Sequence, residues 1–289
     1  MKIEDKELKI IKFSKVNQND LYEFYHRAFY LRHKIIFKNR NWLYGVRFFG
    51  YEPLLMLLNN KIIGHAGMIS NNILKDNKKY KCTWFVDFKI LPEFRSKGLG
   101  TKLSAEWMKV SPHHLAITNN ESPKVFKKLG WLEKTDYKRA ANILNPLKWI
   151  PIMKNLDNRI LEEINFYKYI KSFNVKKIKP FKLKENLSSF KKNFLLNEKI
   201  FNKNISICRD EEWFNWRIID SPFIDNYYFF SKENSFILVH LLNVNKIKRI
   251  NILYSSCTDL KSEVDLSQQL VNWGIENNMD LIWLNHDDL

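Results

Sequence analysis

The stretch that decides the fold is Trp84-Phe-Val-Asp-Phe-Lys-Ile-Leu-Pro-Glu-Phe-Arg-Ser-Lys-Gly-Leu-Gly100. Its first half is rich in residues that favour strands, and it ends at Pro92, which cannot donate a hydrogen bond to a sheet. Two glycines follow, and residues 101–110 then have the apolar spacing of a helix. The sequence therefore predicts a long strand at 80–91, a tight turn and a helix.

The turn between this strand and helix has the composition of an anion-binding loop. Gly98 and Gly100 allow the backbone to approach a ligand without a Cβ in the way. The N–H groups of the first helical turn point at such a ligand, and the helix dipole favours negative charge there. Arg95 and Lys97 add positive charge at the same point. We therefore expect this loop to bind phosphate groups.

Two common phosphate-binding motifs do not fit the loop. A P-loop requires Gly-Lys-Ser/Thr at the start of the helix, but here Gly100 is followed by Thr101-Lys102, in the wrong order. A dinucleotide fingerprint requires a third glycine where this chain has Leu103. A glycine-rich turn is a weak signal alone, so the surrounding segments decide its meaning.

The segments around the loop alternate between strands and helices. In the first half, we expect a strand at 8–13, a helix at 19–37 with Asn19-Asp20 as its N-cap, a hairpin of 53–58 and 62–70, a polar turn at 71–79, a strand at 114–118 and a helix at 123–129. In the last third, we expect strands at 227–230, 235–242, 247–255 and 281–285, with a helix at 262–276. The order of hairpin, strand, helix and strand thus occurs twice, although residue identities barely repeat.

The loop resembles the cofactor motif of the GNAT acetyltransferase superfamily, Arg/Gln-x-x-Gly-x-Gly/Ala after a strand that ends near a proline. Arg95, Gly98 and Gly100 match this pattern. Asn119 followed by Val125-Phe-Lys-Lys-Leu-Gly-Trp131 is similar to the family's second motif. The resemblance covers residues 8–144.

The resemblance implies an α/β fold with a mixed, mostly antiparallel GNAT-type sheet flanked by helices. Residues 1–145 would be the acyl-CoA-binding catalytic domain and 146–184 a connector. Residues 185–289 would be a second, degenerate GNAT-like α/β domain, since the segment after the strand at 247–255 has no Arg-x-x-Gly-x-Gly.

By the same resemblance the acyl donor is acetyl-CoA. The backbone of Phe88–Leu91 would pair with the pantetheine arm, the amides of Arg95–Gly100 would hold the pyrophosphate, and Asn119 would lie near the thioester. The expected cofactor-binding residues are Phe88, Lys89, Ile90, Leu91, Arg95, Ser96, Lys97, Gly98, Leu99, Gly100, Thr101, Asn119 and Phe126.

Acylation of an amine requires a base for the ammonium proton, and the departing thiolate can use an acid. Asp87 is the leading base, and a structural or substrate-binding carboxylate is the alternative reading of the same residue. On a regular strand Asp87 shares a face with Phe85; a bulge would change that direction. In the family the general acid is usually a tyrosine on the second helix, and this chain has Phe126 at that position. Either Tyr137 substitutes, the thiolate leaves unassisted, or the domain is not catalytic. The expected catalytic residues are Asp87, Asn119 and Tyr137.

Composition limits the partners of the chain. Its net charge is +17, but the basic stretches at 75–81, 176–184 and 246–249 are scattered among core-type residues, so we do not expect nucleic-acid binding. The apolar runs are too short to cross a bilayer, so no membrane span is expected. The cysteines Cys82, Cys208 and Cys257 have no metal-ligand or redox spacing, which indicates free thiols in a reducing cytoplasm and no metal site.

These observations predict a cytoplasmic acyl-CoA-dependent N-acyltransferase that acts on a primary amine of a small molecule, for example an amino sugar. Two alternatives stay open. One is an aminoacyl-tRNA-dependent ligase-like transferase, which would use the positive charge but leave the 95–100 loop unexplained. The other is a non-catalytic CoA-binding sensor or assembly subunit, in line with Phe126. A homodimer is also left open.

Overall fold

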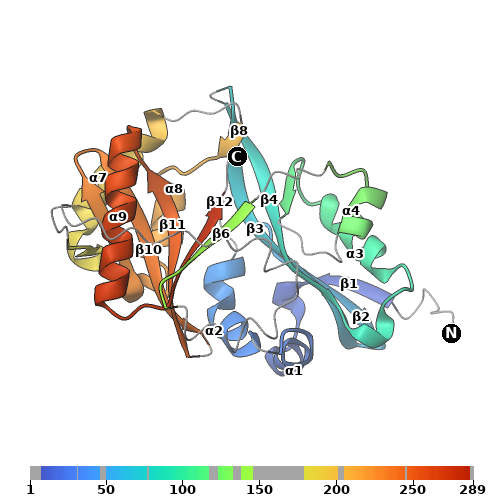
Figure 1. Cartoon of the computed structure of the whole chain (residues 1–289). Helices are drawn as coiled ribbons and strands as arrows, with labels where there is room; N and C mark the ends of the chain where they lie inside the picture. Colours follow the sequence, from blue (N-terminus) through green and yellow to red (C-terminus); the bar gives the residue numbers. More distant parts are fainter. Residues whose placement is uncertain are drawn as a thin grey trace. The chain divides into compact units, whose positions relative to one another are not determined.

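The computed structural model describes residues 8–30, 32–45, 50–76, 78–116, 123–132, 138–145, 179–200, 205–244 and 246–286. The chain divides into two compact units, which are described separately (Figure 1). Unit 1 comprises residues 1–134 and 202–208, and unit 2 comprises 135–201 and 209–289. The expected domain limits at 145 and 184 stay a prediction, because residues 146–178 lie outside the described part.

Unit 1 is built on one sheet. Its strands, in spatial order, are β1 (Leu8–Lys12), β2 (Leu54–Leu58), β3 (Lys61–Lys75), β4 (Lys78–Ile90) and β5 (His114–Ala116), with β8 (Ile205–Ile207) pairing with β3. Strands β4 and β5 run parallel, and the other neighbours are antiparallel. The predicted mixed, mostly antiparallel sheet is therefore confirmed.

The first hairpin forms because its turn suits the twist of the strands. Asn59 and Asn60 both have positive φ, 50° and 61°, as a two-residue hairpin turn requires. The next turn was expected at 71–79, and this expectation is wrong. The strands continue to Lys75 and restart at Lys78, because residues 71–75 of β3 pair with 78–82 of β4 and residues 73–75 also pair with β8.

Helices cover both faces of this sheet. Helices α1 (Gln18–Ala28) and α2 (His33–Tyr44) pack against one face, and α3 (Leu99–Met108) and α4 (Pro123–Lys128) pack against the other. The single helix expected at 19–37 is in fact two, because α1 ends at Phe29 with φ −125° and ψ 34°. The N-cap is Asn17, whose side chain accepts from the amide of Asn19.

Unit 2 is built on a second sheet. Its strands, in spatial order, are β6 (Lys138–Ile143), β12 (Leu281–His286), β11 (Ile247–Ser256), β10 (Ser235–Val244), β9 (Tyr227–Lys232) and β7 (Phe181–Lys182). Helix α9 (Leu260–Glu276) packs on one face. Helices α7 (Leu187–Ile200) and α8 (Glu211–Phe214) pack on the opposite face. Strands β11 and β12 are parallel.

Short turns of other helix types complete both units. The 3₁₀ segments are η2 (Phe13–Lys15), η3 (Pro92–Phe94), η4 (Leu183–Asn186) and η6 (Ile224–Asn226), and a π-helical turn, η5 (Asn215–Ile219), continues α8.

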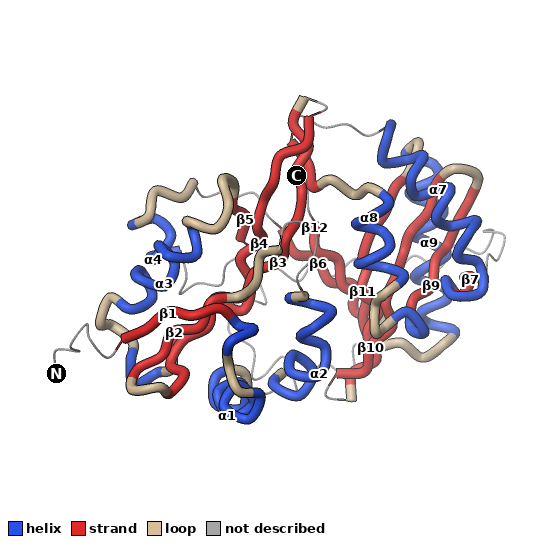
Figure 2. Tube along the Cα trace, turned by 180° about the vertical axis from the view of Figure 1, so that it is seen from behind, coloured by secondary structure: helices blue, strands red, loops and turns tan. Residues whose placement is uncertain are grey.

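The two units share one plan, which Figure 2 allows the reader to trace along the tube. In unit 1 the order β2, β3, β4, α3, β5 ends in a parallel pair, and in unit 2 β9, β10, β11, α9, β12 ends in the same way. Because hairpin, strand, helix and parallel strand recur in the same order, the predicted second half of the same fold is confirmed at the level of architecture.

Candidate functional site

The site begins at a bulge in β4. The register passes from Gly67 opposite Val86 to His65 opposite Lys89, so two residues of β4, Asp87 and Phe88, face only one residue of β3. Asp87 has a φ of 48°, a left-handed conformation that is rare for a residue with a side chain. A Cβ on Gly67 would lie 2.5 Å from the carbonyl oxygen of Val86, so a glycine is required there. The strand therefore bends at Asp87.

The bulge decides which way Asp87 points. Regular alternation would place Asp87 on the face of Phe85, but the extra residue turns its carboxylate to the face that α1 and α2 cover. Phe85 and Phe88 pack on the opposite face, in the cluster that includes α3 and α4. Of the two directions that the sequence left open for Asp87, the structure has the one that a bulge gives.

The side chain of Asp87 is 8% exposed, and two other side chains orient its carboxylate. The hydroxyl of Tyr44 donates to Asp87 Oδ2. The guanidinium of Arg32 lies 3.1 Å from Asp87 Oδ1, and Asp87 is the buried member of this pair. A carboxylate has about four lone-pair sites, so two contacts leave acceptor capacity for a further proton donor.

The backbone of Asp87 is held by a second pair of side chains. His65 Nδ1 lies 2.8 Å from the carbonyl oxygen of Asp87, and the hydroxyl of Tyr25 lies 3.2 Å from His65 Nε2. Burial lowers the pKa of His65, so its ring is neutral. A carbonyl can only accept, so Nδ1 carries the proton and Nε2 accepts from Tyr25. Burial also raises the pKa of Tyr25 and of Tyr44, which keeps both phenols protonated.

Sequence reasoning missed this polar cluster of Tyr25, Arg32, Tyr44 and His65. Tyr25 lies within the helix expected at 19–37, and no polar role was expected for it. The available signal was His65 itself, since a histidine in the middle of an apolar strand requires a partner when it is buried.

The loop after β4 has the shape of an anion site. Ser96 and Gly98 have positive φ, 59° and 75°, and α3 starts immediately afterwards. Arg95 Nε donates to the carbonyl of Ile90 (3.1 Å), and Lys97 Nζ donates to the carbonyl of Glu93 (3.1 Å), so both side chains fold back and fix the loop.

The start of α3 is open toward a ligand. Its N-cap is Gly98, which has no side chain to occupy the first-turn amides, and a Cβ built there would meet no atom within 4 Å. The amide of Lys102 makes the first hydrogen bond of the helix, to Gly98 O. The amides of residues 99–101 come before this first hydrogen-bonded turn. Leu99 is buried, whereas Gly100 and Thr101 are partly exposed.

An edge of β4 leads to this helix start. Strand β4 pairs with β5 from Thr83 to Phe85, and in the described part of the chain this pairing stops at Ala116. Residues 86–90 continue past that point, with Leu91 next. The expected pantetheine-binding residues Phe88, Lys89, Ile90 and Leu91 therefore lie between the end of the β4–β5 pairing and the anion loop. An extended edge followed by an uncapped helix start fits the elongated, diphosphate-bearing shape of a coenzyme A thioester.

The remaining candidate residues fall into two groups. Asn119 and Tyr137 lie outside the described residues. Phe126 is 5% exposed and packs its ring 5.3 Å from that of Phe85 and 4.6 Å from that of Trp131, between centroids. Phe126 is therefore a core residue, and it carries no hydroxyl that could donate a proton.

Comparison with protein families agrees with this geometry. Residues 18–131 match the model described as the Acetyltransferase (GNAT) family. Residues 18–131 therefore form a GNAT-type domain. The match includes α1, β4 with its bulge, the anion loop and α4, so the whole candidate site lies inside the GNAT domain.

Solved structures resemble the whole chain in fold at low sequence identity. A probable N-acyltransferase of Enterococcus faecalis superposes with a TM-score of 0.57 at 10% identity, over 96% of this chain and 64% of that one. A GCN5-related N-acetyltransferase from Anabaena variabilis gives 0.57 at 12%, over 98% and 66%. Saccharomyces cerevisiae N-myristoyltransferase with bound myristoyl-CoA gives 0.56 at 13%, over 96% and 76%. The chain thus spans about two thirds of the first of these proteins.

One curated protein also matches part of the sequence. The DNA-directed RNA polymerase subunit beta'' of Oedogonium cardiacum is 29% identical over 159 residues, which are 55% of this chain and 5% of that subunit. So small a share of the subunit assigns no activity to this chain.

Unit 2 keeps the bulge but not the open helix start of the GNAT domain. The register between β10 and β11 shifts so that Leu253 is the extra residue. The helix after β11 is capped by Asp259, whose carboxylate accepts from Ser262 N (2.8 Å) and Ser262 Oγ (2.8 Å). A side-chain anion therefore caps this helix, whereas the GNAT domain has a glycine N-cap with no side-chain cap.

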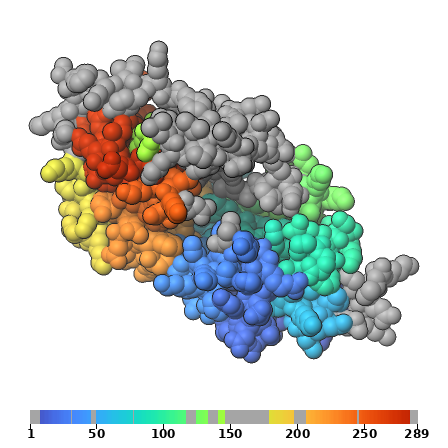
Figure 3. Space-filling view, turned by 60° about the horizontal axis from the view of Figure 1, so that its bottom comes forward, coloured from blue at the N-terminus to red at the C-terminus, as the bar shows by residue number. Residues whose placement is uncertain are grey.

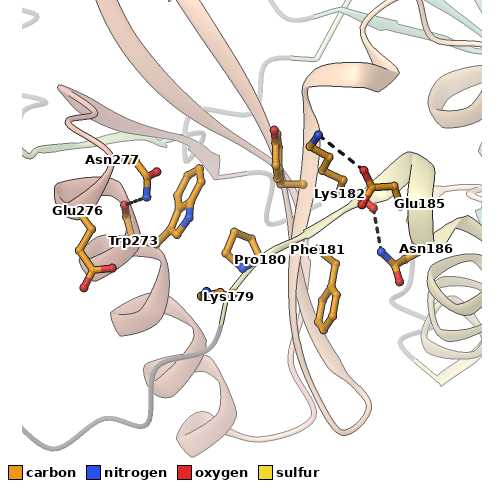
Figure 4. Close-up of a pocket in the computed structure, with 10 residues that line it drawn as sticks. Lys179, Pro180, Phe181, Lys182, Glu185, Asn186, Trp273, Glu276 and Asn277 are labelled. Atoms are coloured by element: carbon orange, nitrogen blue, oxygen red, sulfur yellow. Dashed lines mark hydrogen bonds and ion pairs between the residues drawn. The ribbon is translucent and has the colours of Figure 1, made fainter.

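Unit 2 also has a pocket of about 520 Å³ between β7 and the end of α9 (Figure 4). Trp273 and Tyr228 form part of its wall, with ring centroids 6.0 Å apart. Several polar groups around it bind one another: Asn277 Nδ2 donates to Trp273 O, and Lys182 pairs with Glu185. No reactive constellation comparable to that of the GNAT domain is present among these lining residues.

Two further searches cover the described part of the chain. It contains no group of three or more His, Cys, Asp or Glu side chains arranged to hold a metal ion. Within the same residues, none of the helices has both the length and the apolar character that crossing a bilayer requires.

Proposed function

We propose that this chain is an acyl-CoA-dependent N-acyltransferase that uses acetyl-CoA and acylates a primary amine of a small molecule, such as an amino sugar. The observation that carries the proposal is the sequence of three features along one strand: the bulge at Asp87, the edge of residues 86–90 and the uncapped start of α3. The match of residues 18–131 to the GNAT family supports acyl transfer. We place the reaction in the cytoplasm, and a homodimer is compatible with it.

In this proposal the backbone does most of the binding. Residues 88–91 offer peptide groups to the amides of the pantetheine arm, as an added strand would find them. The amides of residues 95–100 hold the pyrophosphate, with the α3 dipole and the charges of Arg95 and Lys97 beside them. Bound in this way, the thioester supplies an activated acyl carbonyl.

The chain's own residues then have to move one proton. The amine nitrogen forms a bond to the acyl carbon, the carbon–sulfur bond breaks, and the ammonium proton must leave. We assign its removal to Asp87, whose carboxylate retains acceptor capacity while Tyr44 and Arg32 fix its direction. Phe126 has no proton to give to the sulfur, so the thiolate leaves unassisted or takes a proton from Tyr137. Asn119 is proposed to lie near the thioester.

The acceptor is proposed to approach from the surface around Arg32, on the side of the α1 and α2 helices that are drawn in blue in Figure 3. Tyr30 is 72% exposed and Ile35 is 58% exposed in this segment. An exposed ring on the segment that carries Arg32 suits a sugar with an ammonium group, because in this proposal the ring stacks on the sugar and the carboxylate of Asp87 pairs with the amine.

Thermal unfolding with acetyl-CoA tests the donor first, with ATP and NAD as controls. A ligand at a hundred times its dissociation constant stabilises the folded state by about 2.7 kcal/mol. Myristoyl-CoA belongs in the same panel, because one protein of similar fold has it bound. Release of free CoA is then followed across a panel of amines. No stabilisation by any acyl-CoA would refute the proposal.

A CoA-binding protein without turnover is the second candidate, and Phe126 in the core favours it. The two candidates differ in one measurement. A transferase releases CoA faster when its amine is present, and Asp87→Asn lowers that rate while acetyl-CoA still stabilises the fold. Stabilisation without release, over an amine panel that includes amino sugars, polyamines and amino acids, would favour the sensor.

A further inference from the structure

We propose that His65 is a positioning residue for acyl transfer: its buried imidazole holds the Asp87–Phe88 peptide in the bulge, and this fixes the Phe88 N–H and the Asp87 carboxylate for the reaction. The inference rests on the proposed function and deepens it. It begins with the carbonyl of Asp87, one of the two residues of β4 that share a single facing residue on β3. His65 Nδ1 lies 2.8 Å from that oxygen and holds it with a side-chain hydrogen bond.

The direction of the peptide follows from its planarity. In a trans peptide the C=O and the following N–H point in opposite directions. Because the Asp87 carbonyl points at His65, the Phe88 N–H points away from it. The Phe88 side chain packs with the α3 and α4 cluster, on the face opposite His65. In this proposal the Phe88 amide, turned away from His65, donates to an acyl carbonyl oxygen.

The contact of His65 with this peptide is specific, because both ring nitrogens of His65 have a hydrogen-bond partner. His65 is fully buried, and Tyr25 donates to its Nε2 at 3.2 Å. The rings of Tyr25, Tyr44 and Phe29 lie at centroid distances of 5.4, 5.5 and 5.9 Å from the imidazole. These rings prevent a flip of His65, so its Nδ1–H can only point at Asp87.

The groups that face this imidazole come from three elements. Tyr25 belongs to α1, Tyr44 to α2 and Asp87 to β4. Tyr44 binds the carboxylate of the same residue whose carbonyl His65 binds. One residue is therefore held at both its backbone and its side chain, which explains how a left-handed Asp87 persists without glycine.

The test uses the full chain and three substitutions. His65→Leu removes both hydrogen bonds, and His65→Asn keeps a side-chain N–H close to the place of Nδ1. Tyr25→Phe removes only the hydroxyl. The matched control is His113→Leu, because His113 Nδ1 also contacts a backbone carbonyl, that of Lys81 at 3.1 Å, but is exposed and lies away from the bulge.

Two readouts do not require activity. In protein labelled with ¹⁵N-histidine, the His65 signal, identified by its loss in His65→Asn, should show a neutral ring protonated at Nδ1. Amide exchange of residues 86–90 should rise about tenfold in His65→Leu, less in His65→Asn, and stay unchanged in His113→Leu. A ring protonated only at Nε2, or exchange that does not change in His65→Leu, would overturn the inference.

Kinetics separate positioning from stability. With rates expressed per folded molecule, His65→Leu should lower kcat roughly 10- to 100-fold and leave the KM for acyl-CoA within about threefold. His65→Asn should recover most of the loss, and Tyr25→Phe should cost little. Equal losses for His65→Leu and His65→Asn would sink the positioning role. If the wild-type chain releases no CoA with any amine, the proposed function fails, while the exchange and tautomer results still decide whether His65 holds the peptide.

Discussion

Gly98 and Asp259 occupy the same place in the two units: each is the N-cap of the helix that follows the bulged strand. Gly98 leaves the first-turn amides of α3 open. Asp259 fills those of α9 with its own carboxylate, which accepts from Ser262 N at 2.8 Å. The same position in the fold is therefore without a side-chain cap in one unit and capped by the chain's own carboxylate in the other.

The first prediction concerns a charge placed at this point. Gly98→Asp would put a carboxylate where the pyrophosphate is proposed to bind, and the free space around Gly98 accommodates it. We expect the affinity for acetyl-CoA, measured by isothermal titration calorimetry, to fall at least tenfold, which is about 1.4 kcal/mol.

Gly98→Asn is the matched control for this substitution. Asparagine has nearly the same shape and also tolerates the left-handed region, so its backbone cost is similar to that of aspartate. It should bind acetyl-CoA more tightly than the aspartate variant, and the gap between the two should narrow in high salt. Equal affinities would show that no anion binds at the start of α3.

The second prediction concerns the cap in unit 2. Asp259→Ala removes the hydrogen bonds to Ser262 and should lower the free energy of unfolding by about 1 kcal/mol, measured by urea denaturation. Asp259→Asn should retain most of the stability because its amide oxygen still accepts. Neither change should affect acetyl-CoA binding; a loss of binding in Asp259→Ala would mean that unit 2 contributes to the cofactor site.

The fold could be predicted largely because its signals are local. The alternation of residues 80–91, the stop at Pro92 and the glycines that follow place β4 and α3 within a few residues of where they lie. The prediction of one long helix at 19–37 was wrong because the apolar spacing continues across the break between α1 and α2. No glycine or proline marks that break. The turn expected at 71–79 was wrong because polar residues 71–75 pair with β4, and one further partner, β8, comes from more than a hundred residues away.

The site could be predicted only in its backbone part. The anion loop depends on glycines and charges that are adjacent in the sequence. The cluster around Asp87 depends on Tyr25, Tyr44 and His65, which come from three elements and meet only when the sheet folds. The direction of Asp87 depends on a bulge, and a bulge depends on strand register, which no local pattern in β4 reveals.

The third prediction concerns the glycine that permits the bulge. A Cβ on Gly67 would lie 2.5 Å from Val86 O, so Gly67→Ala must push β3 and β4 apart and should lower stability by about 1–3 kcal/mol. Gly100→Ala is the control, since its Cβ would meet Phe88 at an ordinary 3.4 Å. Urea denaturation of both variants checks the difference, and equal stabilities would argue against the close approach at Gly67.

The fourth prediction concerns a buried histidine of unit 2. His240 is 7% exposed, and burial lowers its pKa to about 4, with the nearby charges of Arg217 and Arg249 acting in the same direction. The unfolded chain binds a proton here near pH 6.5, whereas the folded chain binds it only near pH 4. Stability is therefore fully present above pH 6.5 and is lost as pH falls from 6.5 toward 4. Since one pKa unit is 1.36 kcal/mol, the full loss is about 3 kcal/mol.

His240→Leu should remove this pH dependence, because leucine fills a similar volume and binds no proton. Amide exchange of β10 between pH 7 and pH 4.5 measures the effect within unit 2 and is compared after correction for the intrinsic exchange rate. The wild-type strand should lose protection over this interval by more than the variant does. An equal loss of protection in the wild type and the variant would contradict this prediction. It would mean that His240 already carries its proton in the folded chain, despite the nearby charges of Arg217 and Arg249.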